Sequence, residues 1–183
     1  MKVLAVSFAL LAAYESTLAI ARFQRRKRVF DAAQARARAL GRPLVVVGDP
    51  DAGAHTRLAR AYACGDACVD LRGCPLCPTS IEADVTAGLS SFEDDSAVVY
   101  VSCVLEYVSD AERAESELLR IAGRRENLFL VYVDPWSFTS VLYPGARWRA
   151  RAKGTWSPVS TSQKAVIGAL LLGCGAGALA VRR

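Results

Sequence analysis

Residues 97–133 read AVVYVSCVLEYVSDAERAESELLRIAGRRENLFLVYV and contain two apolar runs on either side of a charged stretch. The runs, 97–104 and 128–133, are continuous and rich in β-branched residues, which is typical of strands buried on both faces of a parallel sheet. The stretch 111–122 has the charged pattern of a surface helix. A strand, a helix and a strand at this spacing predict a right-handed βαβ unit.

Shorter segments upstream extend the same pattern. Apolar runs that predict further strands lie at 44–47, 67–71 and 81–85. The sequence GDPDAG at 48–53 predicts a turn, and residues 55–62 predict a helix. The alternation predicts an α/β domain over residues 43–150 with a doubly wound, mostly parallel sheet. Ligands of such sheets bind at the carboxyl ends of the strands, where the strand order reverses.

Residues 81–135 run from IEADV through SSFEDDSAVVYVSC, VLEYV and a charged helix to LFLVYVDP. This succession resembles the class I S-adenosylmethionine-dependent methyltransferases. In that family an acidic strand end precedes an Asp-rich turn, a strand, a "VLEHV"-like segment, a helix and a long final strand. The counterpart of that segment here is VLEYV at 104–108. With the first strand and its turn, the resemblance covers about residues 43–137 and implies a Rossmann-like methyltransferase fold.

The resemblance also implies a site for S-adenosylmethionine at the carboxyl edge of the sheet. Asp70 would accept hydrogen bonds from the ribose hydroxyls, and Asp84 would lie near the adenine amine. Ser102 and Cys103 would border the substrate mouth. The full set implied for the cofactor is Gly48, Asp49, Asp51, Gly53, Asp70, Asp84, Ser102 and Cys103. His55, the only histidine, follows the turn and is the best single candidate for a catalytic or substrate-contacting group.

The turn after the first strand departs from the family pattern. The family has an acid followed by Gly-x-Gly-x-Gly, whereas GDPDAG places Asp49 and Asp51 near the positions of the first two glycines and keeps Gly53. The short segment after residue 133 predicts a fold trimmed at its C-terminal hairpin. Two functions remain open. One is a membrane-anchored methyltransferase that acts on a lipid, a membrane-associated small molecule or a protein, and the other is a non-catalytic component of a membrane complex or virion.

Apolar segments near both ends predict two membrane-spanning helices. Residues 3–21, interrupted by Glu15, are close to the span of a bilayer, and the uncharged residues 165–181 are about the minimum. A cleaved signal peptide is the rival interpretation of the first segment, because Ala19-Ile20-Ala21 has the form of a cleavage site. The expected organisation is a transmembrane helix over 1–22, a basic juxtamembrane helix over 23–42, the domain over 43–150, a linker over 151–164 and a second transmembrane helix over 165–181.

Charge is unevenly distributed along the chain. Residues 22–42 hold eight Lys or Arg and one acid, and residues 147–183 hold seven Lys or Arg and no acid. Basic residues beside apolar segments favour contact with anionic membrane lipid and a domain on the cytosolic side of a cellular, organellar or virion membrane. Residues 43–146 hold seven Arg and sixteen acids, so nucleic acid is not an expected partner.

Gly173 and Gly177 form a small-xxx-small pair suited to contact with other membrane proteins.

Four of the six cysteines lie close together in the sequence. Cys64, Cys68, Cys74 and Cys77 offer four thiolates, and the last two have a spacing that suits chelation of Zn²⁺ by one loop. A disulfide such as Cys74 with Cys77 is a second possibility. Plain thiols are the third, since free cysteine is among the most buried residue types.

Overall fold

The structure is a computed structural model, and it describes residues 2–51, 60–132, 147–149 and 156–158. The chain divides into two compact units. One unit is Phe23–Val133, and the other joins Met1–Arg22 to Asp134–Arg183. The first unit therefore contains the segment 23–42 together with residues 43–133 of the predicted domain, and residues 134–150 belong to the other unit.

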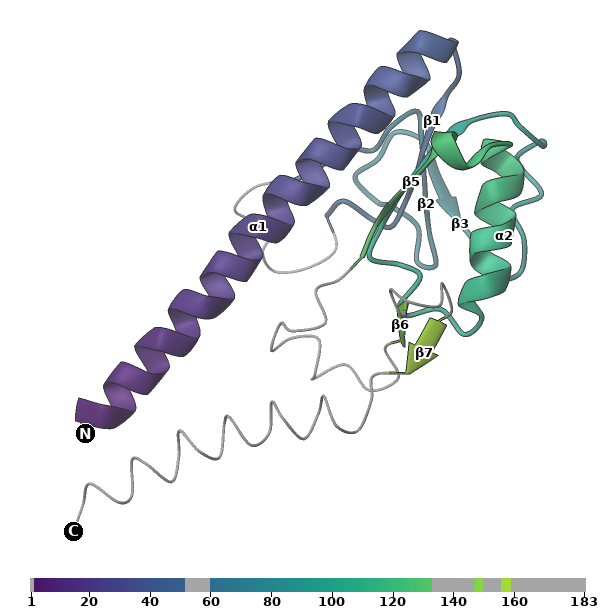
Figure 1. Cartoon of the computed structure of the whole chain (residues 1–183). Helices are drawn as coiled ribbons and strands as arrows, with labels where there is room; N and C mark the ends of the chain where they lie inside the picture. The colour runs from purple at the N-terminus through teal and green to yellow at the C-terminus, as the bar shows by residue number, and fades with distance from the viewer. Residues whose placement is uncertain (1, 52–59, 133–146, 150–155, 159–183) are drawn as a thin grey trace. The chain divides into compact units, whose positions relative to one another are not determined.

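A five-stranded sheet of wholly parallel strands forms the centre of the first unit. Its strands are β1 (Leu44–Val47), β2 (Ala67–Asp70), β3 (Ser80–Glu82), β4 (Val98–Ser102) and β5 (Leu128–Val131) (Figure 1). Their order across the sheet is β3-β2-β1-β4-β5. The chain adds β2 and β3 on one side of β1 and then crosses to β4 on the other side, which is a Rossmann-like arrangement. The predicted α/β fold with a parallel sheet is confirmed.

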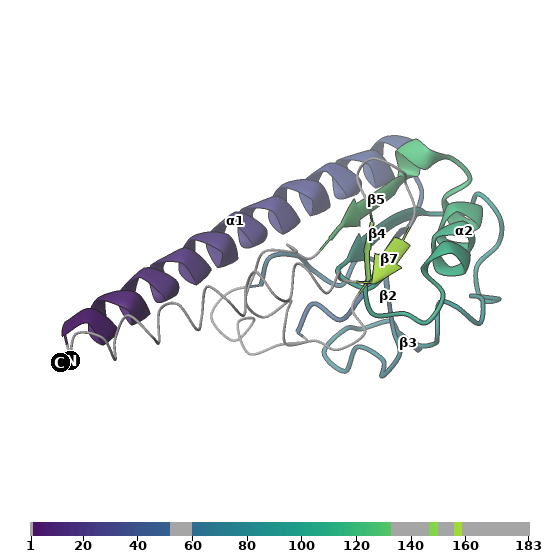
Figure 2. The ribbon, with the colours of Figure 1, turned by 60° about the horizontal axis from the view of Figure 1, so that its bottom comes forward.

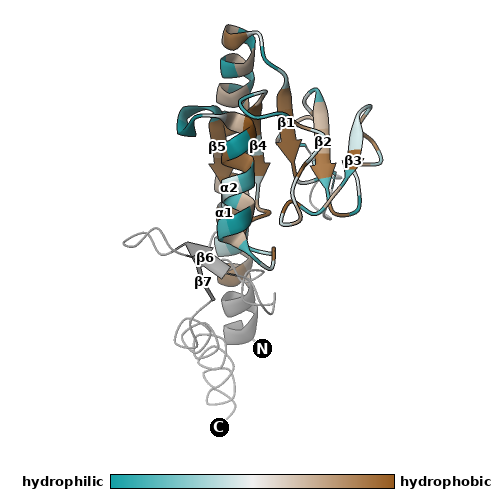
Figure 3. Cartoon of the chain, turned by 90° about the vertical axis from the view of Figure 1, so that its right-hand side faces the viewer, coloured by the Kyte–Doolittle hydropathy of each residue, from teal (hydrophilic) through white to brown (hydrophobic). Residues whose placement is uncertain are grey.

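The central strands are almost wholly apolar because both faces of the sheet are covered. Every residue of β1 and β4 is buried, and these strands are coloured hydrophobic in Figure 3. Residues 23–40 of helix α1 (Lys2–Leu40) lie on one side of the sheet and α2 (Ala111–Ala122) lies on the other, as Figures 1 and 2 show. The edge strand β3 is exposed at two of its three residues.

Helix α1 contributes an apolar stripe to the core. Phe30, Ala33 and Ala37 are buried at helical spacing and belong to one cluster with Val46 and Tyr100 of the sheet. The helix ends at Leu40, two residues before the end of the predicted juxtamembrane helix, and Gly41 follows it. Gly41 has φ +62°, its N–H donates to the Arg38 carbonyl, and the N–H of Arg42 donates to the Ala37 carbonyl. These two bonds form a Schellman motif that satisfies carbonyls of the last turn.

Helix α2 begins and ends at the residues predicted, 111 and 122. The Asp110 side chain accepts a hydrogen bond from the backbone N–H of Arg113 and so caps the first turn. Gly123, at φ +67°, ends the helix by donating to the Leu119 carbonyl. The buried residues of α2 are Ala111, Ala114, Leu118, Ile121 and Ala122.

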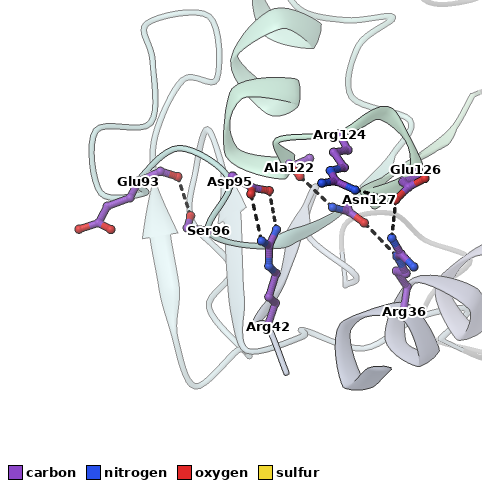
Figure 4. A network of polar contacts seen from close by, with 9 residues as sticks. All are labelled: Arg36, Arg42, Glu93, Asp95, Ser96, Ala122, Arg124, Glu126 and Asn127. Carbon is purple, nitrogen blue, oxygen red and sulfur yellow. Dashed lines mark hydrogen bonds and ion pairs between the residues drawn. The ribbon is translucent and has the colours of Figure 1, made fainter. Parts of the chain in front are cut away.

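Polar contacts join α1 to the start of β5 (Figure 4). Arg36 Nε donates to Asn127 Oδ1 at 2.9 Å, and its Nη2 lies 2.6 Å from a carboxylate oxygen of Glu126. Asn127 Nδ2 donates to the Ala122 carbonyl at 3.0 Å. Asn127 is only 2% exposed, so its amide would be costly to bury without these partners. An arginine of the predicted juxtamembrane helix is thus part of the domain.

A second ion pair in the same region joins Arg42 to Asp95. Arg42 donates from both Nη atoms to the two carboxylate oxygens of Asp95 (Figure 4). These hydrogen bonds lower the pKa of the Asp95 carboxyl. The pair is exposed to solvent, so its contribution to stability is small.

The second unit contains the start of α1 and an antiparallel pair of strands, β6 (Arg147–Arg149) and β7 (Trp156–Pro158). The predicted first span, 3–21, is helical as part of α1. Within the described part of the chain, no helix combines the length and the apolar character needed to cross a membrane. The predicted second span, 165–181, lies outside the described residues.

The remaining predictions of secondary structure differ from the structure at their edges. The strand predicted at 81–85 is Ser80–Glu82, and the strands predicted at 97–104 and 128–133 end at Ser102 and Val131. Of the helix predicted at 55–62, residues 55–59 lie outside the described residues, and residues 60–62 form no helix.

The first testable prediction concerns packing of α2 on the sheet. Leu118 is fully buried, so Leu118→Ala should lower the free energy of unfolding by about 2–5 kcal/mol through lost burial and a residual cavity. The adjacent Leu119 is 37% exposed, and Leu119→Ala should change the same quantity by less than about 0.5 kcal/mol. Urea unfolding of the full-length chain measures both. An equal loss of unfolding free energy in the two variants would contradict the packing of Leu118, and not of Leu119, against the sheet.

Candidate functional site

The strand order reverses at one point on the carboxyl edge of the sheet, between β1 and β4. β1 and β4 are neighbours, and the chain leaves β1 toward β2 but leaves β4 toward β5. Open α/β sheets bind ligands at such a switch point, where the loops depart in opposite directions. The residues that follow the two strands are 48–51 and 103–106. Six of the eight residues implied for the cofactor occur in these loops, at the end of β4 or at the end of β2: Gly48, Asp49, Asp51, Asp70, Ser102 and Cys103.

Gly48 makes the sharp exit from β1 possible. Its φ is +102°, and its N–H donates to the Val69 carbonyl of β2 at 2.9 Å. A Cβ at this position would lie 2.9 Å from a methyl carbon of Val104 and 3.1 Å from the Ser102 carbonyl oxygen. The turn after β1 therefore lies tightly against the loop after β4, and only glycine fits there.

The two acids of this turn have partners within the protein. The Asp49 side chain accepts a hydrogen bond from the Asp51 backbone N–H at 2.9 Å, which is an Asx turn. Asp51 forms an ion pair with Arg60, whose Nε lies 2.6 Å from Asp51 Oδ1. Both carboxylates are therefore stabilised without a ligand. Gly53 and His55 lie outside the described residues.

Asp70, at the carboxyl end of β2, holds the turn in place. Its Oδ2 accepts from the Asp49 backbone N–H at 3.1 Å, and its Oδ1 accepts from the Arg72 backbone N–H at 3.1 Å. Each carboxylate oxygen can accept two hydrogen bonds, so capacity remains for an additional donor. Asp70 thus connects the β2 loop to the turn after β1.

Asp84 has a different role from the others. It lies in the loop after β3 and accepts from both the backbone N–H and the hydroxyl of Thr86. These hydrogen bonds lower the pKa of the Asp84 carboxyl. These two hydrogen bonds stabilise the turn at residues 84–86. They do not connect Asp84 to the residues at the ends of β1 and β4.

Cys103 follows β4 in a conformation that side chains seldom adopt. Its φ is +56°, and its backbone N–H donates to the Val131 carbonyl at 2.8 Å. The Cys103 sulfur accepts from Arg26 Nη2 of α1 at 3.0 Å. Burial raises the pKa of the Cys103 thiol, although the nearby Arg26 guanidinium opposes this shift. The thiol is consequently protonated at neutral pH, which suits a lining group better than a nucleophile.

Aromatic side chains lie beside this cysteine on the α1 side of the sheet. Tyr62 and Tyr100 have ring centroids 5.1 Å apart, and Phe30 completes the cluster. The Tyr62 hydroxyl lies 3.4 Å from the Gly48 carbonyl oxygen and 3.3 Å from that of Asp49. Burial raises the pKa of Tyr62 to about 12, so the phenol stays neutral and donates a hydrogen bond.

Arg26 and Tyr62 were not predicted as site residues. The basic cluster before the domain suggested lipid headgroups for Arg26, yet this arginine contacts the end of β4. A sequence signal was present: Arg26 lies four residues before Phe30, on the stripe that continues through Ala33 and Ala37. Tyr62 carried no comparable pattern.

The four clustered cysteines form two disulfides, Cys64–Cys77 and Cys68–Cys74. The prediction of plain thiols is wrong for these residues, and so is the suggested Cys74–Cys77 pairing. The ligand atoms of Cys68, Cys74 and Cys77 also lie within 4.8 Å of one another, so the cluster has the dimensions of a metal site. Cys103 is the free cysteine among the described residues.

A hollow of about 610 Å³ lies near the amino end of β1 and away from the predicted site. Arg38, Arg42, Arg60, Cys64 and Leu76 are among its lining residues. Arg42 and Arg60 are both held in ion pairs with acids. The hollow therefore contributes no residue to the candidate site at the carboxyl edge of the sheet.

Comparison with protein-family models, with curated proteins and with solved structures finds no match for this chain. The parallel sheet with strand order β3-β2-β1-β4-β5 is compatible with a Rossmann-like fold. The resemblance to methyltransferases rests on the residues quoted above.

The second testable prediction concerns the turn after β1. Gly48→Ala should lower the free energy of unfolding by about 2–4 kcal/mol, because a positive φ costs about 1–2 kcal/mol for an L residue and the new methyl group overlaps Val104 and Ser102. Gly41→Ala is the matched control. Its φ is +62° with no atom within 4 Å of the new Cβ, so only the backbone term of about 1–2 kcal/mol applies. Urea unfolding that ranks the two variants equally would contradict the close approach at Gly48.

Proposed function

We propose that the carboxyl edge of the sheet binds S-adenosylmethionine and that the protein transfers its methyl group to a membrane-associated acceptor. The observation that carries the proposal is the strand order β3-β2-β1-β4-β5, with a glycine turn after β1 and an acid at the end of β2. This combination suits a nucleoside, because the backbone approaches it at the turn and the acid accepts from ribose hydroxyls.

The chemistry asks little of the protein beyond alignment. Methyl transfer joins a nucleophile of the acceptor to the methyl carbon while the bond to the sulfonium sulfur breaks. Holding the reacting atoms in line supplies most of the acceleration, and a base is needed only where the acceptor must lose a proton. Cys103 and Ser102, at the end of β4, would border the acceptor.

A non-catalytic role is the second candidate, and one observation favours it. Asp49, Asp51 and Asp70 are all engaged by groups of the protein itself. A turn stabilised in this way has no need of a ligand. In this case the domain would serve as a structural component of a membrane assembly.

The third testable prediction separates the two candidates by cofactor binding to the full-length chain. At about 100 times its Kd, S-adenosylmethionine or its demethylated product should stabilise the fold by about 2.7 kcal/mol. For a chain of this size that raises Tm by about 5–10 °C. Asp70→Asn should weaken binding about ten- to a hundredfold, because charge-assisted hydrogen bonds to the ribose are lost. Calorimetric titration gives the affinities, and Asp31→Asn, on the exposed face of α1, is the control.

The outcomes of this experiment are distinct. No binding of either ligand at millimolar concentration favours the non-catalytic candidate. A dinucleotide that binds in their place would contradict the methyltransferase proposal while keeping the site. An Asp70→Asn variant that is less stable but binds with unchanged affinity would restrict Asp70 to holding the turn.

We also propose that residues 3–21 and 165–181 attach the protein to a membrane, with the domain on the cytosolic side. The uncharged composition of residues 165–181 and the basic residues that flank them support this proposal. Of the basic residues in segment 22–42, four donate hydrogen bonds to the domain, namely Arg25, Arg26, Arg36 and Arg42. Arg28 and Arg38 are exposed and would face lipid headgroups.

The fourth testable prediction is that the protein stays in the membrane pellet after extraction with alkaline carbonate. This treatment releases proteins held at the membrane surface by electrostatic contacts, but it does not release helices inserted in the bilayer. Release into the supernatant would contradict membrane insertion. In sealed vesicles that expose their cytosolic side, added protease should digest the domain. Protection of the domain would instead place it on the opposite side.

A further inference from the structure

The four cysteines are brought together by the fold around β2. Cys68 lies on the strand itself, and its N–H donates to the Thr79 carbonyl at 2.8 Å. Cys74 and Cys77 lie in the following loop, where the Cys77 N–H donates to the Cys74 carbonyl at 2.9 Å. The Ser80 hydroxyl accepts from the Cys74 N–H at 2.6 Å. Cys64 precedes β2 and reaches the cluster through its bond to Cys77.

The positions of the sulfurs suit a tetrahedral ion. In a four-thiolate zinc site each Zn–S bond is about 2.3 Å, which separates the sulfurs by about 3.8 Å. The sulfurs of Cys68, Cys74 and Cys77 already lie within 4.8 Å of one another, and that of Cys64 is bonded to one of them. Cys64 lies outside this group of three, so once the two S–S bonds are broken its side chain must turn toward the other sulfurs for four thiolates to surround one ion.

The surroundings of the cluster favour a structural site. Cys68 and Cys74 are 0% exposed and Cys77 is 8% exposed, so the ion would be enclosed. All four donors are sulfur, the ligand type that selects Zn²⁺ over Mg²⁺ or Ca²⁺. Four thiolates around Zn²⁺ carry a net charge of −2. Arg38, which lines the same hollow as Cys64, would offset part of this charge, whereas Arg42 and Arg60 are already paired with acids.

We propose that Cys64, Cys68, Cys74 and Cys77 bind one Zn²⁺ in the reduced protein and that the two disulfides are the oxidised form of the same site. Reduction by a dithiol transfers two electrons and two protons to each S–S bond, giving four thiols and two molecules of the oxidised reductant. Zn²⁺ then binds four thiolates and displaces four protons. An oxidant such as a small-molecule disulfide, which takes up two electrons for each S–S bond and is itself reduced to two thiols, reverses the sequence and releases the ion.

The cysteine cluster lies next to the proposed ligand site and contacts the turn after β1. The Cys68 sulfur is 4.0 Å from the Gly48 carbonyl oxygen, and Cys68 is two residues from Asp70 on the same strand. Either form of the cluster therefore fixes the end of β2 from which Asp70 reaches the turn. The zinc proposal does not depend on which ligand binds there.

The fifth testable prediction is made on the full-length chain, prepared with dithiothreitol and without oxygen, and compared with an air-oxidised sample. Metal analysis after incubation with Zn²⁺ and desalting should give about one equivalent in the reduced protein and none in the oxidised protein. Co²⁺ in place of Zn²⁺ should give the absorption spectrum of a tetrahedral four-thiolate site. Cys68→Ser should lose the bound metal, whereas Cys103→Ser, outside the cluster, should retain it.

Two results would overturn the proposal. One is a reduced, folded protein with all four thiols titratable and no bound Zn²⁺ or Co²⁺. The other is an unchanged metal content in Cys68→Ser, which would place the ion elsewhere. If Cys68→Ser fails to fold, the Co²⁺ spectrum of the unmodified chain still decides the matter, because a spectrum with fewer than four thiolates excludes this ligand set.

Discussion

Burial of β1 and β4 on both faces is the constraint on which the rest of the structure depends. A parallel sheet with strands such as LVVV and VVYVS has no face that tolerates water, so it needs a helical layer on each side. Helix α2 supplies one layer. The other comes from α1, whose residues 23–40 present Phe30, Ala33 and Ala37 to the sheet. Without these residues the core around Tyr100 would be open to solvent.

This constraint explains why basic residues occur in an apolar interface. A helix that covers a sheet places its flanking side chains near strand ends and loops. Arg36 reaches the buried Asn127, and Arg26 reaches Cys103. Long arginine side chains cover apolar surface with their stems while the guanidinium groups bind polar atoms at the border. A sequence pattern that resembles a lipid-facing helix therefore also describes a helix that covers a domain.

Much of the sheet could be predicted from the sequence, whereas the site residues that the resemblance implied remain a prediction. The strand at 44–47, the strand predicted at 67–71 and observed at 67–70, and the helix at 111–122 follow from local signals, namely apolar runs and a charged helical pattern. The cysteine pairing could not be predicted, because spacing alone does not determine connectivity. The roles of Asp49 and Asp70 were also beyond reach, since they depend on which backbone N–H groups the folded turn presents.

The two disulfides are nested, because the Cys68–Cys74 loop lies wholly within the Cys64–Cys77 loop. A protease that cut the chain between residues 71 and 73, in the loop after β2, would leave the fragments doubly linked. Such a cleaved molecule would keep β2 attached to the sheet and would migrate as one species on a gel until it was reduced. The loop after β2 can therefore be processed in an oxidising environment without separation of the two parts of the chain.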